Sequence, residues 1–210
     1  MVRALFLVLV SLAAAPGAWA AEARLPRHPA PSPNGEQIAF SWQGDLWRVS
    51  SEGGQAERLT AHPALDRFPV WSRDGQWIAF ESDRHGNPDV FLMAADGSSE
   101  PIRLTFASTD DRPVDFSPDG SAVLFVSTRE ESFRFRNDFY TVPVGGGTPQ
   151  LLMGAQGLDA SWSPNGRTLA FTRGSTRWTR RGYRGSANRD LWLWNGADEV
   201  RQLTDFDGDD

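Results

Sequence analysis

Four short turn sequences that recur at near-regular spacing constrain the fold of this chain more than any other feature. They are SPNG ending at Gly35, SRDG at Gly75, SPDG at Gly120 and SPNG at Gly166, so successive turns lie 40, 45 and 46 residues apart. Each supplies what a type I turn favours: Ser first, Pro second, Asp or Asn third and Gly fourth. Arg73 replaces Pro once, which this turn tolerates. A turn repeated at this period predicts a repeat architecture.

Strand-like segments follow each turn in the same order. An apolar triplet ends in Phe five residues after each Gly: IAF at 38–40 and 78–80, VLF at 123–125 and LAF at 169–171. The next strand begins with an acid, at Asp45, Asp89, Asp138 and Asp190. A last strand carries RLT at 58–60 and 103–105, QLLM at 150–153 and QLT at 202–204. The unit is therefore four antiparallel strands in about 40 to 46 residues, the size of a β-propeller blade.

These repeats predict an all-β fold, a β-propeller of four-stranded antiparallel blades with four blades present. The blades are expected at 24–60, 66–105, 111–153 and 159–204, and residues 205–210 are expected to be a link to a missing fifth blade. A hydrophobic content of 40% with nine Trp can fill a substantial core and argues against disorder. No window beyond the N-terminal segment keeps a helical period, because Gly or Pro interrupts it.

The N-terminal segment has the pattern of a secretory signal peptide over residues 1–20. Arg3 precedes an apolar run at 5–15, then Pro16-Gly17 and the small-residue pattern at 18–20. Eleven apolar residues at ~1.5 Å each cover about half of a bilayer core, so a membrane anchor is disfavoured and no span is expected after cleavage. We therefore expect export, to the periplasm first and to the extracellular space as the alternative. A net charge of −6 disfavours a nucleic-acid partner.

Two stretches carry a family resemblance. FPVWSRDGQWIAFESDRHGNPDVFLMAADGSSEPIRLT at 68–105 resembles the repeat shared by TolB and the tricorn-type proteases. YRGSANRDLWLW at 183–194, leading into LTDFDGDD, resembles the N-terminal propeller of exported tricorn-like serine peptidases. The resemblance covers about 24–210. It implies a ring with more than four blades, so that these four form an incomplete ring, and a catalytic domain outside this chain.

The same resemblance leaves three functions open. The first is a substrate-docking or gating propeller of an exported tricorn-like serine peptidase. The second is a non-catalytic TolB-like periplasmic interaction propeller, and the third is the propeller of a prolyl-oligopeptidase-like enzyme. Within the chain there is no Cys, no G-x-S-x-G and no H-E-x-x-H. We therefore predict no catalytic residue, no metal site and no cofactor here, and a peptide or protein as the partner.

One hairpin loop varies in length and is a candidate binding surface. From the triplet Phe to the next Asp the distances are 5, 9, 13 and 19 residues, and in a propeller this loop lies on the same face as the inter-blade links. The longest insertion holds basic and aromatic residues suited to an acidic or carboxylate-bearing partner. They are Arg177, Trp178, Arg180, Arg181, Tyr183 and Arg184. The alternative is a solvated loop, or one packed on other domains.

A second candidate is an Asp in each inter-blade link. Asp66, Asp111, Asp159 and Asp210 each lie six residues after the Thr or Met that closes a repeat. As a ring at the channel mouth, these carboxylates would attract a cation or a basic peptide. As a structural feature, they would accept hydrogen bonds from nearby backbone N–H groups and hold the link, which is the reading we favour.

Overall fold

The computed structural model describes residues 23–129, 137–174, 189–196 and 199–205, which form four four-stranded antiparallel sheets. Blade 1 contains β1 (Arg27–Pro31), β2 (Gln37–Trp42), β3 (Asp45–Ser50) and β4 (Glu57–Arg58). Blade 2 contains β5 (Asp66–Trp71), β6 (Trp77–Ser82), β7 (Asp89–Ala94) and β8 (Ile102–Arg103). Blade 3 contains β9 (Asp111–Phe116), β10 (Ala122–Ser127), β11 (Asp138–Pro143) and β12 (Gln150–Met153). Blade 4 contains β13 (Gly157–Trp162), β14 (Leu169–Arg173), β15 (Asp190–Trp194) and β16 (Val200–Gln202).

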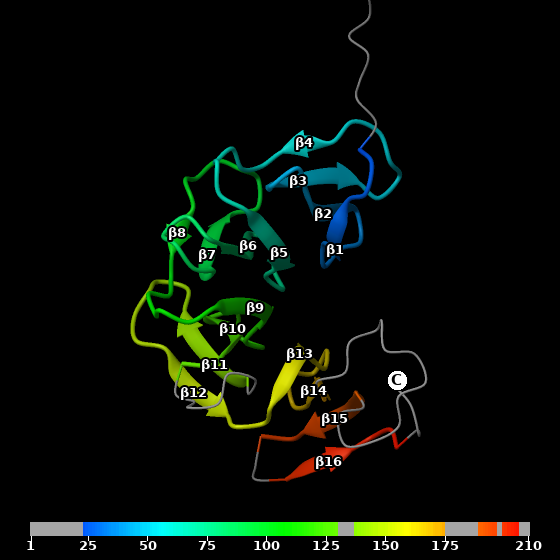
Figure 1. Cartoon of the computed structure of the whole chain (residues 1–210). Helices are drawn as coiled ribbons and strands as arrows, with labels where there is room; N and C mark the ends of the chain where they lie inside the picture. The colour runs from blue at the N-terminus through cyan, green and yellow to red at the C-terminus, as the bar shows by residue number, and fades with distance from the viewer. Residues whose placement is uncertain (1–22, 130–136, 175–188, 197–198, 206–210) are drawn as a thin grey trace, which may run out of the picture.

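The blades follow one another around a common centre, with the first strand of each blade innermost (Figure 1). This arrangement confirms the predicted propeller of four-stranded blades. The described residues include no helix able to cross a membrane.

The hydrophobic core consists of three clusters, each formed between two consecutive blades. Between blades 1 and 2, Leu46 packs with Phe80 and Phe91. Between blades 2 and 3, Val90 packs with Phe125 and other buried side chains. Between blades 3 and 4, Phe139 packs with its neighbours of β14. Blades 2 and 3 are covered by a neighbouring blade on both faces, so their middle strands are continuous apolar runs in the sequence.

The four repeated turns form the predicted hydrogen bond from the fourth residue to the first. In each turn the Gly N–H donates to the Ser carbonyl at 2.9 Å, and each Gly has a φ between 69° and 73°, which favours glycine. The turns also contact one another. A Cβ added to Gly166 would lie 2.5 Å from the Pro118 side chain of the preceding turn, whereas one added to Gly75 would lie at an ordinary contact distance of 3.9 Å from Pro33. The Pro and Gly of the motif therefore serve packing between blades as well as turn geometry.

In each innermost strand the pairing with the second strand shifts register once. The shift lies between residues 27 and 30 in blade 1, 67 and 70 in blade 2, 113 and 115 in blade 3, and 157 and 160 in blade 4. Pro29, Pro69 and Pro113 lie in this stretch of the first three blades. A proline has no N–H to offer, so these inner edges are poor templates for an added strand.

The register of blade 4 corrects one sequence prediction. Asp66 pairs with Ser82, and the residue that pairs at the same position in blade 4 is Gly157, opposite Arg173. Asp159, predicted to be equivalent to Asp66 and to start the blade, lies two residues further along β13. The reason is steric. A Cβ on Gly157 would lie 2.2 Å from the Phe139 ring, so this ring fills the space that an Asp side chain needs.

Candidate functional site

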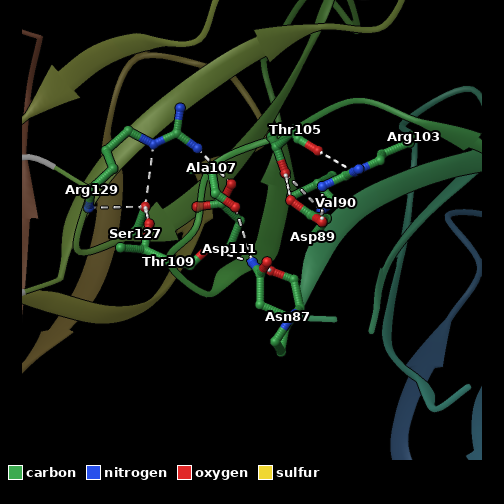
Figure 2. Close-up of polar contacts among 11 residues, drawn as sticks. Asn87, Asp89, Val90, Arg103, Thr105, Ala107, Thr109, Asp111, Ser127 and Arg129 are labelled. Atoms are coloured by element: carbon green, nitrogen blue, oxygen red, sulfur yellow. Dashed lines mark hydrogen bonds and ion pairs between the residues drawn. The ribbon is translucent and has the colours of Figure 1, made fainter. Parts of the chain in front are cut away.

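In blades 1 and 2, the loop between the second and third strands lies on the same face as the inter-blade link that follows it, as predicted. The Asp66 N–H donates to the Gly44 carbonyl at 2.8 Å, and the Asp111 N–H donates to the Pro88 carbonyl at 2.9 Å. The Asn87 amide donates to the Ala107 and Thr109 carbonyls of the following link, at 3.1 and 2.9 Å (Figure 2). Both of these loops are thus tied to the links that follow them.

Two of the predicted site carboxylates form buried ion pairs at this face. Asp66 accepts from Arg84 at 2.7 Å, and Asp111 accepts from Arg129 at 2.5 Å; both carboxylates have 0% exposed side chains. The Arg129 guanidinium also lies over the rings of Phe125 and Tyr140. Ser127 accepts a hydrogen bond from its Nε (Figure 2). The ion pair and the ring contacts fix the second strand to the first.

This burial gives the two carboxylates a structural position rather than a solvent-facing one. The partner is an arginine of the same blade, whereas the structural reading from sequence expected backbone N–H groups. The Oδ1 atoms of Asp66 and Asp111 are buried and accept from no described group. Neither carboxylate is therefore accessible to a ligand in solution.

A second ion pair links the third and outermost strands. Asp89 accepts from Arg103 at 2.6 Å, while Thr105 accepts from the Val90 N–H and donates to Asp89 (Figure 2). Asp45 and Arg58 repeat the ion pair in blade 1 at 2.5 Å. Burial raises the pKa of Asp89, and Arg103 opposes this effect. The Asp and RLT patterns are visible in the sequence, and their co-occurrence in repeats 1 and 2 is the signal from which the ion pair could be predicted.

The channel mouth is a hollow of about 260 Å³ that the innermost strands of all four blades line. Its polar and aromatic side chains form a chain of contacts across the blades. His28 of blade 1 lies with its ring centroid 3.8 Å from that of Phe68 in blade 2. The Arg112 guanidinium of blade 3 lies 4.9 Å from the Phe68 ring centroid, and it donates to Asp159 of blade 4 at 2.9 Å. Asp159, with 55% of its side chain exposed, is therefore the one described candidate of the predicted acidic ring that lines the mouth.

Arginines dominate the charge at the mouth. The pKa of His28 is lowered first by burial and then by Arg67, Arg27 and Arg112. Glu81 pairs with Arg67 at 2.7 Å, but burial outweighs the arginines and raises the pKa of Glu81. The three guanidinium groups that lower the pKa of His28 therefore surround this ring with positive charge, in a chain whose net charge is −6.

Behind the mouth the channel continues as a hollow of about 590 Å³, and the two share Pro69, Val70 and Val114 as lining residues. Asp115 also lines this hollow and accepts a hydrogen bond from the backbone N–H of Trp162 at 2.7 Å. Burial raises the pKa of the Asp115 carboxyl. At the far end Arg73 donates to the carbonyls of Ser163 and Pro164 in blade 4. The arginine that replaces the turn proline thus links blade 2 to blade 4.

The remaining predicted residues lie outside the described part of the chain. These are Arg177, Trp178, Arg180, Arg181, Tyr183, Arg184 and Asp210. The ends of the insertion are described: β14 ends at Arg173, over the Trp192 ring at 5.1 Å, and β15 begins at Asp190. Among the described ranges, no group of three His, Cys, Asp or Glu side chains could hold a metal ion.

The sequence and the fold are similar to those of known proteins. The family model of the tricorn protease N-terminal β-propeller domain matches residues 23–210. Tricorn protease homolog 1 of Streptomyces coelicolor is 29% identical over 164 residues, which are 78% of this chain and 15% of that protein. The solved tricorn protease superposes with a TM-score of 0.74 at 18% identity, over 90% of this chain and 19% of that one. The putative TolB of Agrobacterium tumefaciens superposes with a TM-score of 0.69 at 22% identity, over 87% of this chain and 62% of that one.

The two structural likenesses concern the fold, and the chain spans 15% of the length of the Streptomyces relative. The family match, in contrast, extends over nearly the whole sequence. The chain belongs to the family of tricorn protease N-terminal β-propeller domains.

Proposed function

We propose that the chain is the substrate-docking propeller of an exported tricorn-like serine peptidase, and that it binds peptide or protein segments at its channel. One observation carries the proposal: the channel mouth opens on the face where links and loops gather, and all four blades line it. Apolar and aromatic walls with a few charged groups are what a binding site needs. The family membership and the short share of the relative's length support a role within a larger peptidase.

The lining favours recognition through side chains over addition of a strand. Pro29, Pro69 and Pro113 remove N–H donors from the inner edges of three blades. Trp71 and Trp162 add apolar area deeper in the channel. A docked segment would therefore be held by stacking, apolar contact and charge pairing in the channel.

Binding can be tested with the full chain and fluorescein-labelled peptides of six to ten residues, with anisotropy as the readout. Val114 lines both hollows, so Val114→Phe should narrow the channel and weaken binding by about tenfold or more. Val200→Phe, on the exposed strand β16, is the matched control and should bind like the wild type. Circular dichroism verifies that both variants fold. Equal binding by folded Val114→Phe and wild type would contradict docking in the channel.

The proposal assigns hydrolysis to a part of the peptidase outside these 210 residues. The chain alone should leave a fluorogenic peptide intact. Cleavage that a serine-directed inhibitor blocks would contradict this assignment.

Export rests on the pattern at residues 1–20, and N-terminal sequencing of the protein from a periplasmic fraction should find a start near residue 21. Recovery of uncleaved protein from the cytoplasm alone would contradict export.

A further inference from the structure

We infer that the channel binds a proline-rich segment in the polyproline II conformation, with Trp71 and Trp162 as aromatic walls. The inference rests on the proposed docking function and specifies the class of the docked segment. The lining of the channel, the hydrogen bonds of its backbone carbonyls, a buried indole N–H and the balance of charge support it.

Proline and tryptophan account for half of the residues that line the hollow of about 590 Å³. They are Pro31, Pro33, Pro69, Trp71, Trp162 and Pro164. At the mouth the lining continues with Pro29 and Pro113 and with the rings of His28 and Phe68. Aromatic-lined grooves are the surfaces on which proline-rich segments bind, because pyrrolidine rings pack on aromatic faces without side-chain freedom to lose.

Backbone carbonyls along the channel already accept hydrogen bonds from side chains of the chain itself. The Trp71 Nε1 donates to the Ala30 carbonyl at 3.0 Å, and Arg73 donates to the Ser163 and Pro164 carbonyls. An amide N–H of a docked segment would compete for these acceptors, and a buried N–H without an acceptor is costly. Proline carries no N–H. A proline-rich segment therefore avoids this cost, and its preformed conformation lowers the entropic cost of docking.

The indole N–H of Trp162 is a donor without an acceptor in the described part of the chain. Trp162 lines the hollow, and its Nε1 is among the buried atoms for which the described groups offer no partner. Its counterpart in blade 2, Trp71, donates to Ala30 instead. The carbonyls of a polyproline II segment form no internal hydrogen bonds. One of them would supply the acceptor that Trp162 lacks.

Charge in this hollow is balanced, in contrast to the mouth. The lining contains one guanidinium, that of Arg73, and one carboxylate, that of Asp115. Arg73 lowers the pKa of Asp115, which burial raises. The carboxylate also accepts from the backbone N–H groups of Phe116 and Trp162, each at 2.7 Å. A neutral segment complements this hollow, because both charged side chains already have partners.

The test compares three nine-residue peptides that carry the same neutral dye at the N-terminus and an amide at the C-terminus. The first repeats Pro-Pro-Ser, the second has Ala in place of each Pro, and the third is the mirror image of the first. The mirror image has the same composition and the same missing N–H groups but forms a helix of the opposite hand. By anisotropy, the full wild-type chain should bind the first peptide about tenfold more tightly than either of the others.

A pair of tryptophan variants locates the site. Trp162→Leu removes the aromatic wall and the indole N–H, so the preference for the proline peptide over the alanine peptide should fall to about twofold or less. Trp47→Leu is the matched control and should keep the preference. Trp47 lies beside Trp42 at 5.1 Å between ring centroids, as Trp162 lies beside Trp194 at 6.0 Å, but it belongs to β3 and not to the lining of the hollow. Circular dichroism verifies that both variants fold.

Equal wild-type affinity for the proline and alanine peptides would overturn the inference and leave channel docking intact. Equal affinity for the two mirror-image forms would also overturn it, and this comparison needs no variant to fold. A full preference in folded Trp162→Leu would overturn it as well. Failure of these three peptides and of the fluorescein-labelled peptides to bind would instead overturn the proposed docking function itself.

Discussion

Blades 2 and 4 have the same strand order but are held at the start of the innermost strand by different chemistry. In blade 2 that position is Asp66, buried and paired with Arg84, whose guanidinium lies over Phe80 and Phe91. In blade 4 the position is Gly157, and the Phe139 ring of blade 3 occupies the space beside it. One repeat position is therefore filled by an ion pair in one blade and by an aromatic ring in another.

The size of the residue on the preceding blade accounts for the choice. The second residue of the third strand is Leu46 in blade 1, Val90 in blade 2 and Phe139 in blade 3. The innermost strand of the next blade begins with Asp66 after Leu46 and with Asp111 after Val90. After the larger Phe139 it begins with glycine. The repeats therefore share a closely packed contact between consecutive blades, although the residues that fill it differ.

Removal of the blade 2 carboxylate should give the largest effect. Asp66→Ala leaves the Arg84 charge, 13% exposed, without its partner, so the free energy of unfolding should fall by about 3 to 5 kcal/mol. The matched variant in blade 4 is Asp159→Ala, whose carboxylate is 55% exposed, and it should cost about 1 kcal/mol or less. Urea denaturation followed by circular dichroism measures both. Equal costs would mean that the two aspartates are equivalent after all.

A side chain at the glycine of blade 4 should have the next largest effect. Gly157→Ala places a Cβ 2.2 and 2.3 Å from two carbons of the Phe139 ring and 3.2 Å from Phe171, so unfolding free energy should fall by about 3 kcal/mol. Adding Phe139→Val, which copies Val90 of blade 2, should remove the clash. In a double-mutant cycle the two substitutions should then cost less together than the sum of their separate costs. Additive costs would show that Phe139 is not what excludes a side chain here.

Much of the fold was readable in the sequence because the turns repeat, and the same logic explains what was missed. A count of six residues after Met153 gives Asp159. The link from Met153 to the first residue of β13, however, is two residues shorter than the corresponding links before blades 2 and 3. A count of six residues back from Ser163, as Asp66 lies from Ser72, reaches Gly157. The turn was the better origin because its hydrogen bonds fix its register.

The channel mouth could not be predicted from the repeats. His28, Phe68 and Arg112 come from three blades, and the rings and the guanidinium that meet there are different chemical groups. A periodic pattern reports what the repeats share, whereas this site is built from what distinguishes them. The buried pairs of Arg84 and Arg129 left a weak signal, because each arginine lies four residues after the triplet Phe.

The turns give another contrast between blades 2 and 4. Arg73 stands where blade 4 has Pro164, and it donates to the Ser163 and Pro164 carbonyls at 2.9 and 3.1 Å. Arg73→Pro restores the common turn sequence but removes both bonds, so unfolding free energy should fall by about 1 kcal/mol in urea denaturation. Arg73→Lys keeps the charge but loses the planar guanidinium that reaches both carbonyls. Its unfolding free energy should lie between those of the wild type and Arg73→Pro. An Arg73→Pro protein as stable as the wild type would show that the bridge adds nothing to stability.

The smallest effect concerns the third turn residue, which is Asp in blades 2 and 3 and Asn in blades 1 and 4. In blade 3, hydrogen bonds from Ser117 and from Ser121 lower the pKa of Asp119 from 3.8 to about 2. A lowered pKa means that the folded state favours the ionised carboxylate. Its contribution is therefore complete above about pH 4 and is lost as the pH falls through about 2.

Exchange of the two turn residues should exchange this pH dependence. Asp119→Asn keeps an Oδ1 acceptor, as Asn165 does for Ser163 at 2.7 Å, so the cost at pH 7 should stay near 0.5 kcal/mol and vanish near pH 2. Asn165→Asp should gain the same small dependence in blade 4, because Ser163 and the Arg167 N–H already donate to that side chain. Unfolding free energies between pH 5 and pH 2 measure both variants against the wild type. A difference between Asp119→Asn and wild type that stays constant over this range would show that the turn does not distinguish the ionised from the neutral carboxyl.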